Sequence, residues 1–203
     1  MEKTIFLFRK HPDRSDADFA RHYIHNHAPL GARLTRCLLG YTVNIVEKPG
    51  GPDAITEHWL PQAKDLFTPD VAYATREDFE AVVADDRTLF SGFDLYIVVE
   101  ETYPVQADPL VAAAGHVTPE AKAIWLYPDA GSAPPPPPGA RRVVDNRVGF
   151  RLVYEGATRV SVAPDIGLIR MAWGPDAAML AAAAPGAILV AEHRFIPPPV
   201  WRS

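Results

Sequence analysis

The first hundred residues alternate strand and helix patterns in an order that admits few folds. Strand-like periodicity occurs in four runs, 4–8, 38–46, 54–60 and 93–101. Helical patterns follow the first and third of them, and the second of these helices is predicted at 76–84. In the order βαββαβ, each helix crosses the same face of a four-stranded antiparallel sheet, which is the ferredoxin-like arrangement. The other sheet face is then apolar and requires a partner sheet.

A second unit is predicted beyond a stretch of mixed Ala, Val, Gly and Pro, with the boundary near Val105. Its strand and helix patterns resemble a worn copy of the first unit: strands at 122–127, 148–155, 168–173 and 188–195, and a helix at 175–184. We therefore divide the chain into domains 1–105 and 106–203. The predicted fold class is α+β, with two ferredoxin-like halves forming a pseudo-dimeric α+β barrel, the second half being degenerate.

The second half lacks a counterpart of the first helix, because the sequence GSAPPPPPGARR stands in its place. Five consecutive prolines cannot continue an α-helix and favour an extended segment. An exposed linker is the preferred interpretation of this insertion, and a ligand for a proline-recognising module is the alternative.

Residues 15–30, SDADFARHYIHNHAPL, contain a helix with a recognisable start and end. Ser15 is a typical N-cap, answered by Asp18 three residues later. Pro29 disfavours helical geometry at the preceding residue, which predicts that the helix stops there. The residues that share one face at helical spacing are Phe19, His22, Tyr23, Asn26, His27 and Leu30.

Polar side chains on an inward face among aromatic residues are unusual for plain core. His22 and His27 are therefore candidate functional residues, the alternative being histidines bonded to backbone carbonyls. His25 is expected to face solvent. In the strands, Tyr41 and Asn44 lie on opposite faces. Glu57 stands between apolar neighbours, either as a satisfied structural acid or as part of a cavity wall.

Charge and composition exclude several classes of partner. The formal charge of −5 leaves no basic surplus for binding nucleic acid. No apolar stretch reaches the roughly 20 residues of a membrane-spanning helix, so no membrane segment is expected. A single cysteine, Cys37, excludes an intrachain disulfide, and no secretory leader is evident. These features predict a cytoplasmic protein.

The stretch FLFRKHPDRSDADFARHYIHNHAPL, with GYTVN and EHWL further on, resembles the EthD family of dimeric α+β-barrel proteins over residues 3–103. The most specific element is Phe19, Tyr23 and His27 at spacings of four, followed by Ala-Pro-Leu. The resemblance implies two sheets joined face to face into a barrel with helices outside. Related barrels include cofactor-independent cyclases, decarboxylases, dehydratases and isomerases, as well as monooxygenases and haem enzymes. The fused half and the proline run depart from the family pattern.

The preferred mechanism is cofactor-independent general acid–base catalysis, in which a histidine both removes and returns a proton. We expect a lyase or isomerase (a dehydratase, decarboxylase or cyclase) acting on an apolar, oxygenated ring compound, with His27 and His22 as catalytic residues. The predicted substrate-binding residues are Phe19, Tyr23, Asn26, Tyr41, Asn44, Glu57 and His58.

No metal is expected, because His22 and His27 lie about 140° apart on an α-helical wheel. Haem remains open, since one histidine can ligate it. The alternative function is a non-catalytic small-molecule-binding protein or an accessory to an oxygenase system. Partners are limited to a small apolar or aromatic substrate and a homodimer through a surface other than the barrel sheets.

Overall fold

The structure is a computed structural model that describes residues 1–47, 50–102, 116–117, 120–155 and 158–197. The predicted domain boundary at Val105 lies outside these residues. The first half contains β1 Glu2–Lys10, α1 Asp16–His22, the π-helical turn η1 Tyr23–His27, α2 Ala28–Leu34, β2 Gly40–Val46, β3 Ala54–Leu60, the 3₁₀ turn η2 Ala63–Phe67, α3 Pro69–Ala72, α4 Arg76–Leu89 and β4 Phe90–Thr102. The second half contains β5 His116–Val117, β6 Ala121–Tyr127, the 3₁₀ turn η3 Ala130–Ser132, β7 Arg142–Glu155, β8 Thr158–Val162, β9 Leu168–Gly174, α5 Ala177–Ala183 and β10 Ile188–Ile196.

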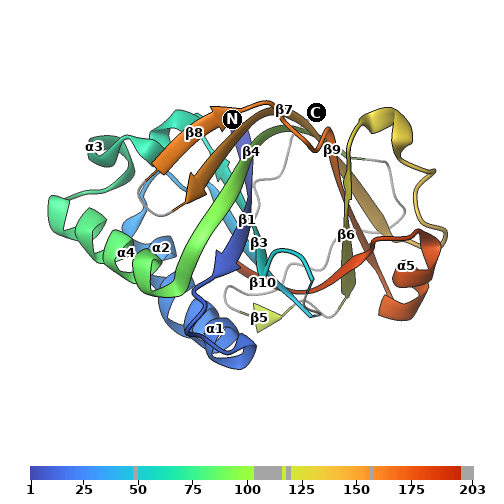
Figure 1. Ribbon diagram of the computed structural model, residues 1–203, viewed down its shortest axis with the longest axis horizontal. Helices are drawn as coiled ribbons and strands as arrows, with labels where there is room; N and C mark the ends of the chain where they lie inside the picture. Colours follow the sequence, from blue (N-terminus) through green and yellow to red (C-terminus); the bar gives the residue numbers. More distant parts are fainter. Residues whose placement is uncertain (48–49, 103–115, 118–119, 156–157, 198–203) are drawn as a thin grey trace.

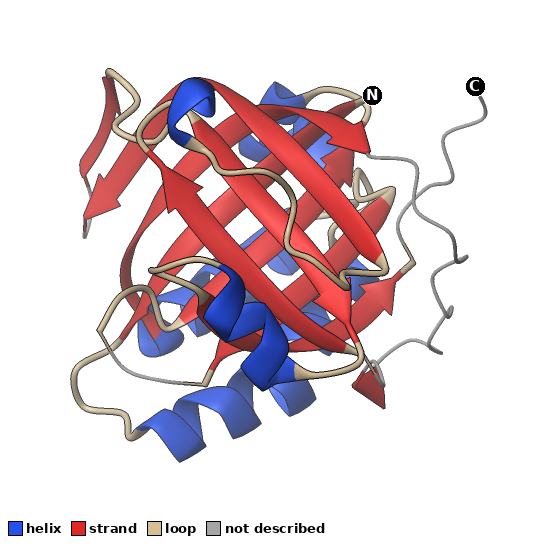
Figure 2. Cartoon of the chain, turned by 90° about the vertical axis from the view of Figure 1, so that its right-hand side faces the viewer, coloured by secondary structure: helices blue, strands red, loops and turns tan. Residues whose placement is uncertain are grey.

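Eight of the described strands form a closed antiparallel barrel (Figures 1 and 2). Their order is β2-β3-β1-β4-β7-β9-β6-β10, and pairing of β10 with β2 closes the ring, while β5 and β8 are additional. In Figure 1, α1 to α4 lie outside the strands of the first half and α5 lies outside those of the second. The α+β barrel is thus present. In the described residues the second half has one α-helix where a ferredoxin-like half has two, so that finer prediction stays a prediction.

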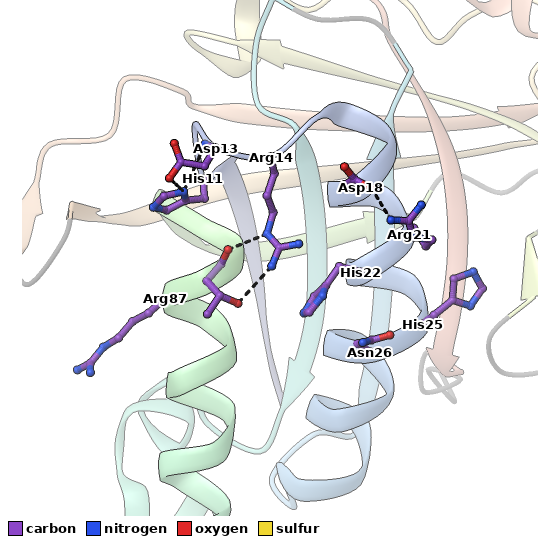
Figure 3. Close-up of a pocket in the computed structure, with 10 residues that line it drawn as sticks. His11, Asp13, Arg14, Asp18, Arg21, His22, His25, Asn26 and Arg87 are labelled. Carbon is purple, nitrogen blue, oxygen red and sulfur yellow. Dashed lines mark hydrogen bonds and ion pairs between the residues drawn. The ribbon is translucent and has the colours of Figure 1, made fainter.

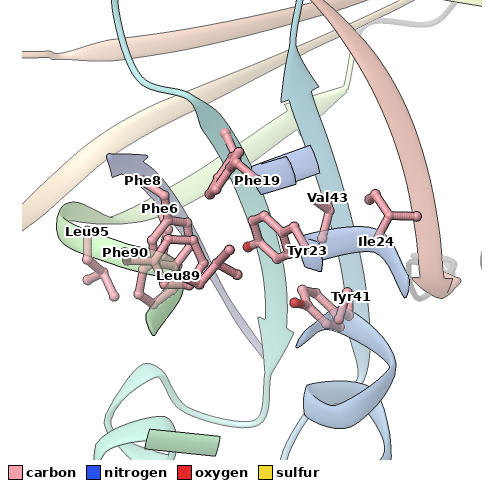
Figure 4. Packing of buried hydrophobic residues seen from close by; sticks show 12 residues of the cluster. Phe6, Phe8, Phe19, Tyr23, Ile24, Tyr41, Val43, Leu89, Phe90 and Leu95 are labelled. Carbon is pink, nitrogen blue, oxygen red and sulfur yellow. The ribbon is translucent and has the colours of Figure 1, made fainter. Parts of the chain in front are cut away.

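Alternation along the strands separates two cores. On β1, Ile5 and Leu7 belong to the apolar cluster inside the barrel, whereas Phe6 and Phe8 belong to the cluster beneath the helices (Figure 4). The interior also carries charge, because Lys3 shares the face of Ile5. None of the described helices is long and apolar enough to cross a membrane.

The two halves repeat the same interior residues in the same register. Lys3 of β1 is paired with Trp59 of β3, and Lys122 of β6 is paired with Trp173 of β9. Each ammonium group lies over its tryptophan ring, at 4.6 Å for Lys3 and 4.5 Å for Lys122. These two sets are related by the pseudo-twofold arrangement of the barrel.

The junctions between the halves repeat in the same way. Glu100 of β4 is paired with Asn146 of β7, and Glu192 of β10 is paired with Asn44 of β2. Each asparagine amide donates to a carbonyl of the next strand, at 2.8 Å for Asn44 and 2.9 Å for Asn146. Like residues thus stand at corresponding register positions of the two halves inside the barrel.

Glu57 breaks this pseudosymmetry, because Met171 stands at the equivalent position of β9. Its carboxylate lies 2.8 Å from Lys3 Nζ and 2.6 Å from Lys122 Nζ, so it links the two halves. Burial opposes ionisation of Glu57, but the charges of Lys122 and Lys3 prevail and hold its pKa far below the usual value. Arg194 adds a compensating positive charge, 2.8 Å from Glu192, and Thr102 stands at the equivalent position of β4.

The prediction that the first helix ends before Pro29 is wrong. The N–H of Ala28 donates to the carbonyl of Tyr23 in the π turn, and the chain continues as α2 with Pro29 in the first turn. A proline is tolerated there, because the first-turn N–H groups of a helix have no intrahelical acceptor. The helical segment thus runs to Leu34.

The proline run is anchored on the barrel although most of it is exposed. Pro137 is buried, and the guanidinium of Arg170 donates to the carbonyl of Pro134. Arg170 also binds both carboxylate oxygens of Asp145, at 2.6 and 2.7 Å. The segment therefore covers the outer face of β9 instead of forming a free linker.

Restoring the symmetry tests the role of the interior charges. Glu57→Met leaves Arg194 as an excess buried positive charge, and Arg194→Thr leaves an excess negative charge, so we expect each change to cost about 3–5 kcal/mol of unfolding free energy. The double variant removes one charge of each sign and should lose at least about 1 kcal/mol less than the sum. Urea unfolding measures all three, and strictly additive losses would contradict the coupling.

Candidate functional site

The π turn brings two histidines to one carboxylate. His22 Nε2 lies 2.7 Å from Asp85 Oδ1, and His27 Nδ1 lies 2.8 Å from Asp85 Oδ2. Asp85 belongs to α4, which extends to Leu89, beyond the end predicted at residue 84. Because one turn of π-helix separates them, the histidines do not diverge as an ideal α-helix requires.

The pKa of Asp85 is set by burial and by these histidines. Burial favours the protonated form, but the hydrogen bonds from His27 and His22 outweigh it and hold the pKa of Asp85 below its usual value. An ionised Asp85 accepts one hydrogen bond from an N–H group of each imidazole ring. His22 consequently carries its hydrogen on Nε2 when neutral, and Nδ1 has no hydrogen-bond partner among the described residues.

His22 borders an open groove of about 880 Å³, whereas His27 is buried. The groove lies between α1–η1 and the end of α4, and its walls include Arg14, His25 and Asn26 (Figure 3). His27 has its second nitrogen 3.5 Å from Asp86 Oδ1. Of the two histidines, His22 is thus the one placed to touch a ligand in the groove.

Three of the predicted binding residues lie together under the helices, next to His27. Figure 4 shows Tyr23 and Tyr41 in this layer. The hydroxyl of Tyr23 lies 2.7 Å from Thr56 Oγ1, and its ring lies 5.2 Å from that of His27. The ring of Tyr41 lies 4.8 Å from that of His58. Phe19 joins this layer as a core residue. The layer supports the histidine pair from behind.

The other predicted residues lie elsewhere. Asn26 is exposed on the groove wall, and Ile24 is buried in its place, because the π turn shifts the inward face. The prediction that Asn26 lies on the inward face is therefore wrong, whereas His25 is exposed as predicted. Asn44 and Glu57 lie inside the barrel, where the amide donates to Glu57 at 3.1 Å. The sheet therefore separates these two residues from the histidines.

Sequence reasoning missed Asp85 and Arg14. Asp85 and Asp86 come directly after the predicted helix 76–84. Extending that helix by one turn would have placed an acidic end opposite the histidine helix, and this was the signal that the sequence offered. Within the described residues, no group of three or more His, Cys, Asp or Glu side chains is placed to hold a metal ion.

Comparison with known proteins shows the fold. No family model matches the chain, so the EthD resemblance stays a prediction. No curated protein matches it either. A solved structure described as an anthrone oxidase-like protein superposes with a TM-score of 0.58 at 9% sequence identity, covering 95% of this chain and 90% of that one. This similarity supports the α+β barrel and, at that identity, shows the fold alone.

His58 gives a direct test of the buried layer. Burial, together with the nearby His27, lowers the pKa of His58 to about 3. The unfolded chain binds this proton near pH 6.5 and the folded chain does not, so His58 makes unfolding free energy fall as pH drops from about 6.5 to 3. NMR should show its ring neutral at pH 5 in folded protein and titrating normally in urea. A folded-state midpoint above about 5 would contradict the placement of His58 against the aromatic layer and His27.

Proposed function

We propose that the protein is a cofactor-independent enzyme that moves a proton on an oxygenated ring compound, with His22 as the base. The observation that carries this proposal is the hydrogen bond from His22 Nε2 to Asp85, made by a ring that borders the groove. A carboxylate that holds one imidazole nitrogen fixes the tautomer and stabilises the cation formed when the other nitrogen takes a proton.

In the proposed reaction, His22 Nδ1 takes a proton from a ring carbon that is conjugated with a carbonyl group. The C–H electron pair moves into the ring and leaves an enolate. Return of the proton to another position makes the enzyme an isomerase, and loss of a leaving group from the enolate makes it a lyase. Proton transfer of this kind typically contributes about 10² to 10⁴-fold.

His27 is better suited to positioning than to contact with substrate. Its two nitrogens face Asp85 and Asp86, and its side chain is only 8% exposed. Its hydrogen bond to the second oxygen of Asp85 holds the carboxylate in the orientation that His22 needs. We therefore propose that His22 transfers the proton while His27 orients Asp85.

The name of the similar barrel suggests a probe. Anthrone is a tricyclic ketone whose ring methylene carries an acidic proton, and its enolate reacts with dioxygen to give anthraquinone and water. Proton abstraction is the first step of that oxidation as well as of the isomerase and lyase reactions proposed here. Anthrone therefore tests the shared step without assuming the fate of the enolate.

The test is exchange of the anthrone methylene protons in D₂O, followed by NMR with oxygen excluded. We expect the protein to accelerate exchange and His22→Gln to lower the protein-catalysed rate by at least about a hundredfold. Asp85→Asn should also slow exchange, because the amide can present a donor to His22 and so select the wrong tautomer.

His25→Gln is the matched control, because His25 lines the same groove and has no bond to Asp85. That variant should exchange the probe at the unaltered rate. Equal losses in the His22 and His25 variants, with both proteins folded, would contradict the assignment of the base.

A non-catalytic binding or accessory role is the second candidate. The openness of the groove favours it, because solvent access weakens proton transfer and leaves binding intact. Ligand binding at the groove without any exchange would support this role over the enzyme.

A further inference from the structure

A base that makes an enolate leaves a negative charge on the substrate, and the groove offers one well-placed cation to receive it. We propose that Arg14 holds an anionic oxygen of the ring compound (an enolate, phenolate or carboxylate) beside His22. This inference rests on the proposed function and adds to it the substrate class, an oxygenated ring with an ionised oxygen.

The guanidinium of Arg14 is held in place by the opposite helix. Arg14 Nε donates to the carbonyl of Thr88 at 2.7 Å, and Nη2 lies 3.5 Å from the hydroxyl of the same residue. Thr88 stands in the last turn of α4, where unpaired carbonyls and the helix dipole favour a cation. The arginine is thereby preorganised across the groove.

One edge of this guanidinium remains for a ligand. Nη1 of Arg14 makes no hydrogen bond in the part of the chain that the structure describes. Figure 3 places the side chain of Arg14 between the two helices, and Arg14, His22 and Asn26 all line the groove. A planar guanidinium with free N–H groups suits an anionic oxygen, and a bond of this kind is stronger than one between neutral groups.

The other arginines of the groove are less suited to this role. Arg21 is engaged by Asp18 on its own helix, and the guanidinium of Arg87 points away from His22 (Figure 3). Of the carboxylates on the groove wall, Asp18 is bound by Arg21 and accepts from the hydroxyl of Ser15, and the side chain of Asp13 is exposed to solvent. Arg14 is thus the groove arginine that combines a fixed position with an available edge.

The chemistry of the two residues is complementary. The proton moves to His22 Nδ1, and the electron pair of the broken C–H bond ends on the substrate oxygen. A cation fixed beside that oxygen stabilises the product of deprotonation more than the neutral ketone, which is the requirement for lowering the barrier. An analogue that already carries the negative charge should therefore bind through Arg14 without any reaction.

The experiment compares 3-hydroxy-2-naphthoate with its neutral methyl ester by calorimetric titration of the full chain. We expect the acid to bind more tightly than the ester. Arg14→Gln should weaken binding of the acid by at least about tenfold and change binding of the ester little. Arg14→Lys should retain part of the affinity, because it keeps the charge and loses the planar fork. Arg87→Gln is the matched control and should change acid binding less than about twofold.

Equal affinities for acid and ester, or equal effects of the Arg14 and Arg87 variants, would overturn this inference. Melting curves show whether Arg14→Gln is folded, and Arg14→Lys gives a second reading if it is not. The outcome is separable from the proposed function, because His22→Gln should abolish exchange of anthrone and keep binding of the acid. If binding of the acid depends on Arg14 but the protein does not accelerate proton exchange, the anion site is supported and the proposed enzymatic function is contradicted.

Discussion

Closure of the barrel buries six charged side chains that must neutralise one another. They are Lys3, Glu57, Glu100, Lys122, Glu192 and Arg194, each no more than 5% exposed. Removing an ion from water costs several kcal/mol, so each charge needs a partner at short distance. Glu57 supplies that partner to both lysines, one from each half, and so makes the two halves electrostatically dependent on each other.

The interior of the barrel and its outer faces differ in how far the two halves repeat. Interior residues repeat between the halves, as Lys3 and Lys122 do, which is the behaviour of a scaffold. The outer faces do not repeat: His58 on β3 corresponds in register to Ala172 on β9, and the proline run covers the second half where the first carries the histidine helix. Binding and proton transfer are thus expected once per chain, at the groove beside His22.

The strands and much of the fold were predictable because alternation reports directly on which face is buried. The same rule indicated that Glu57 faces inward and left its role open. Two features of the candidate site escaped prediction. A π turn depends on a backbone hydrogen bond between residues five apart in sequence, and the local preferences around Pro29 do not predict such a bond. The pairing of His22 with Asp85 joins helices 63 residues apart in sequence, and spacing along one helix cannot supply such a partner.

The location of the site is the central claim, and a crystal structure with a bound ring compound tests it most directly. Four polar atoms on the interior face make no hydrogen bond within the described residues, namely Thr42 Oγ1, Asn44 Oδ1, Trp59 Nε1 and Asn146 Oδ1, so the interior is the rival location. Crystals soaked with 3-hydroxy-2-naphthoate should show the ring in the groove, with an oxygen at Arg14 and the ring edge at His22. A ligand bound inside the barrel against Lys3 and Lys122, with the groove unoccupied, would contradict the account.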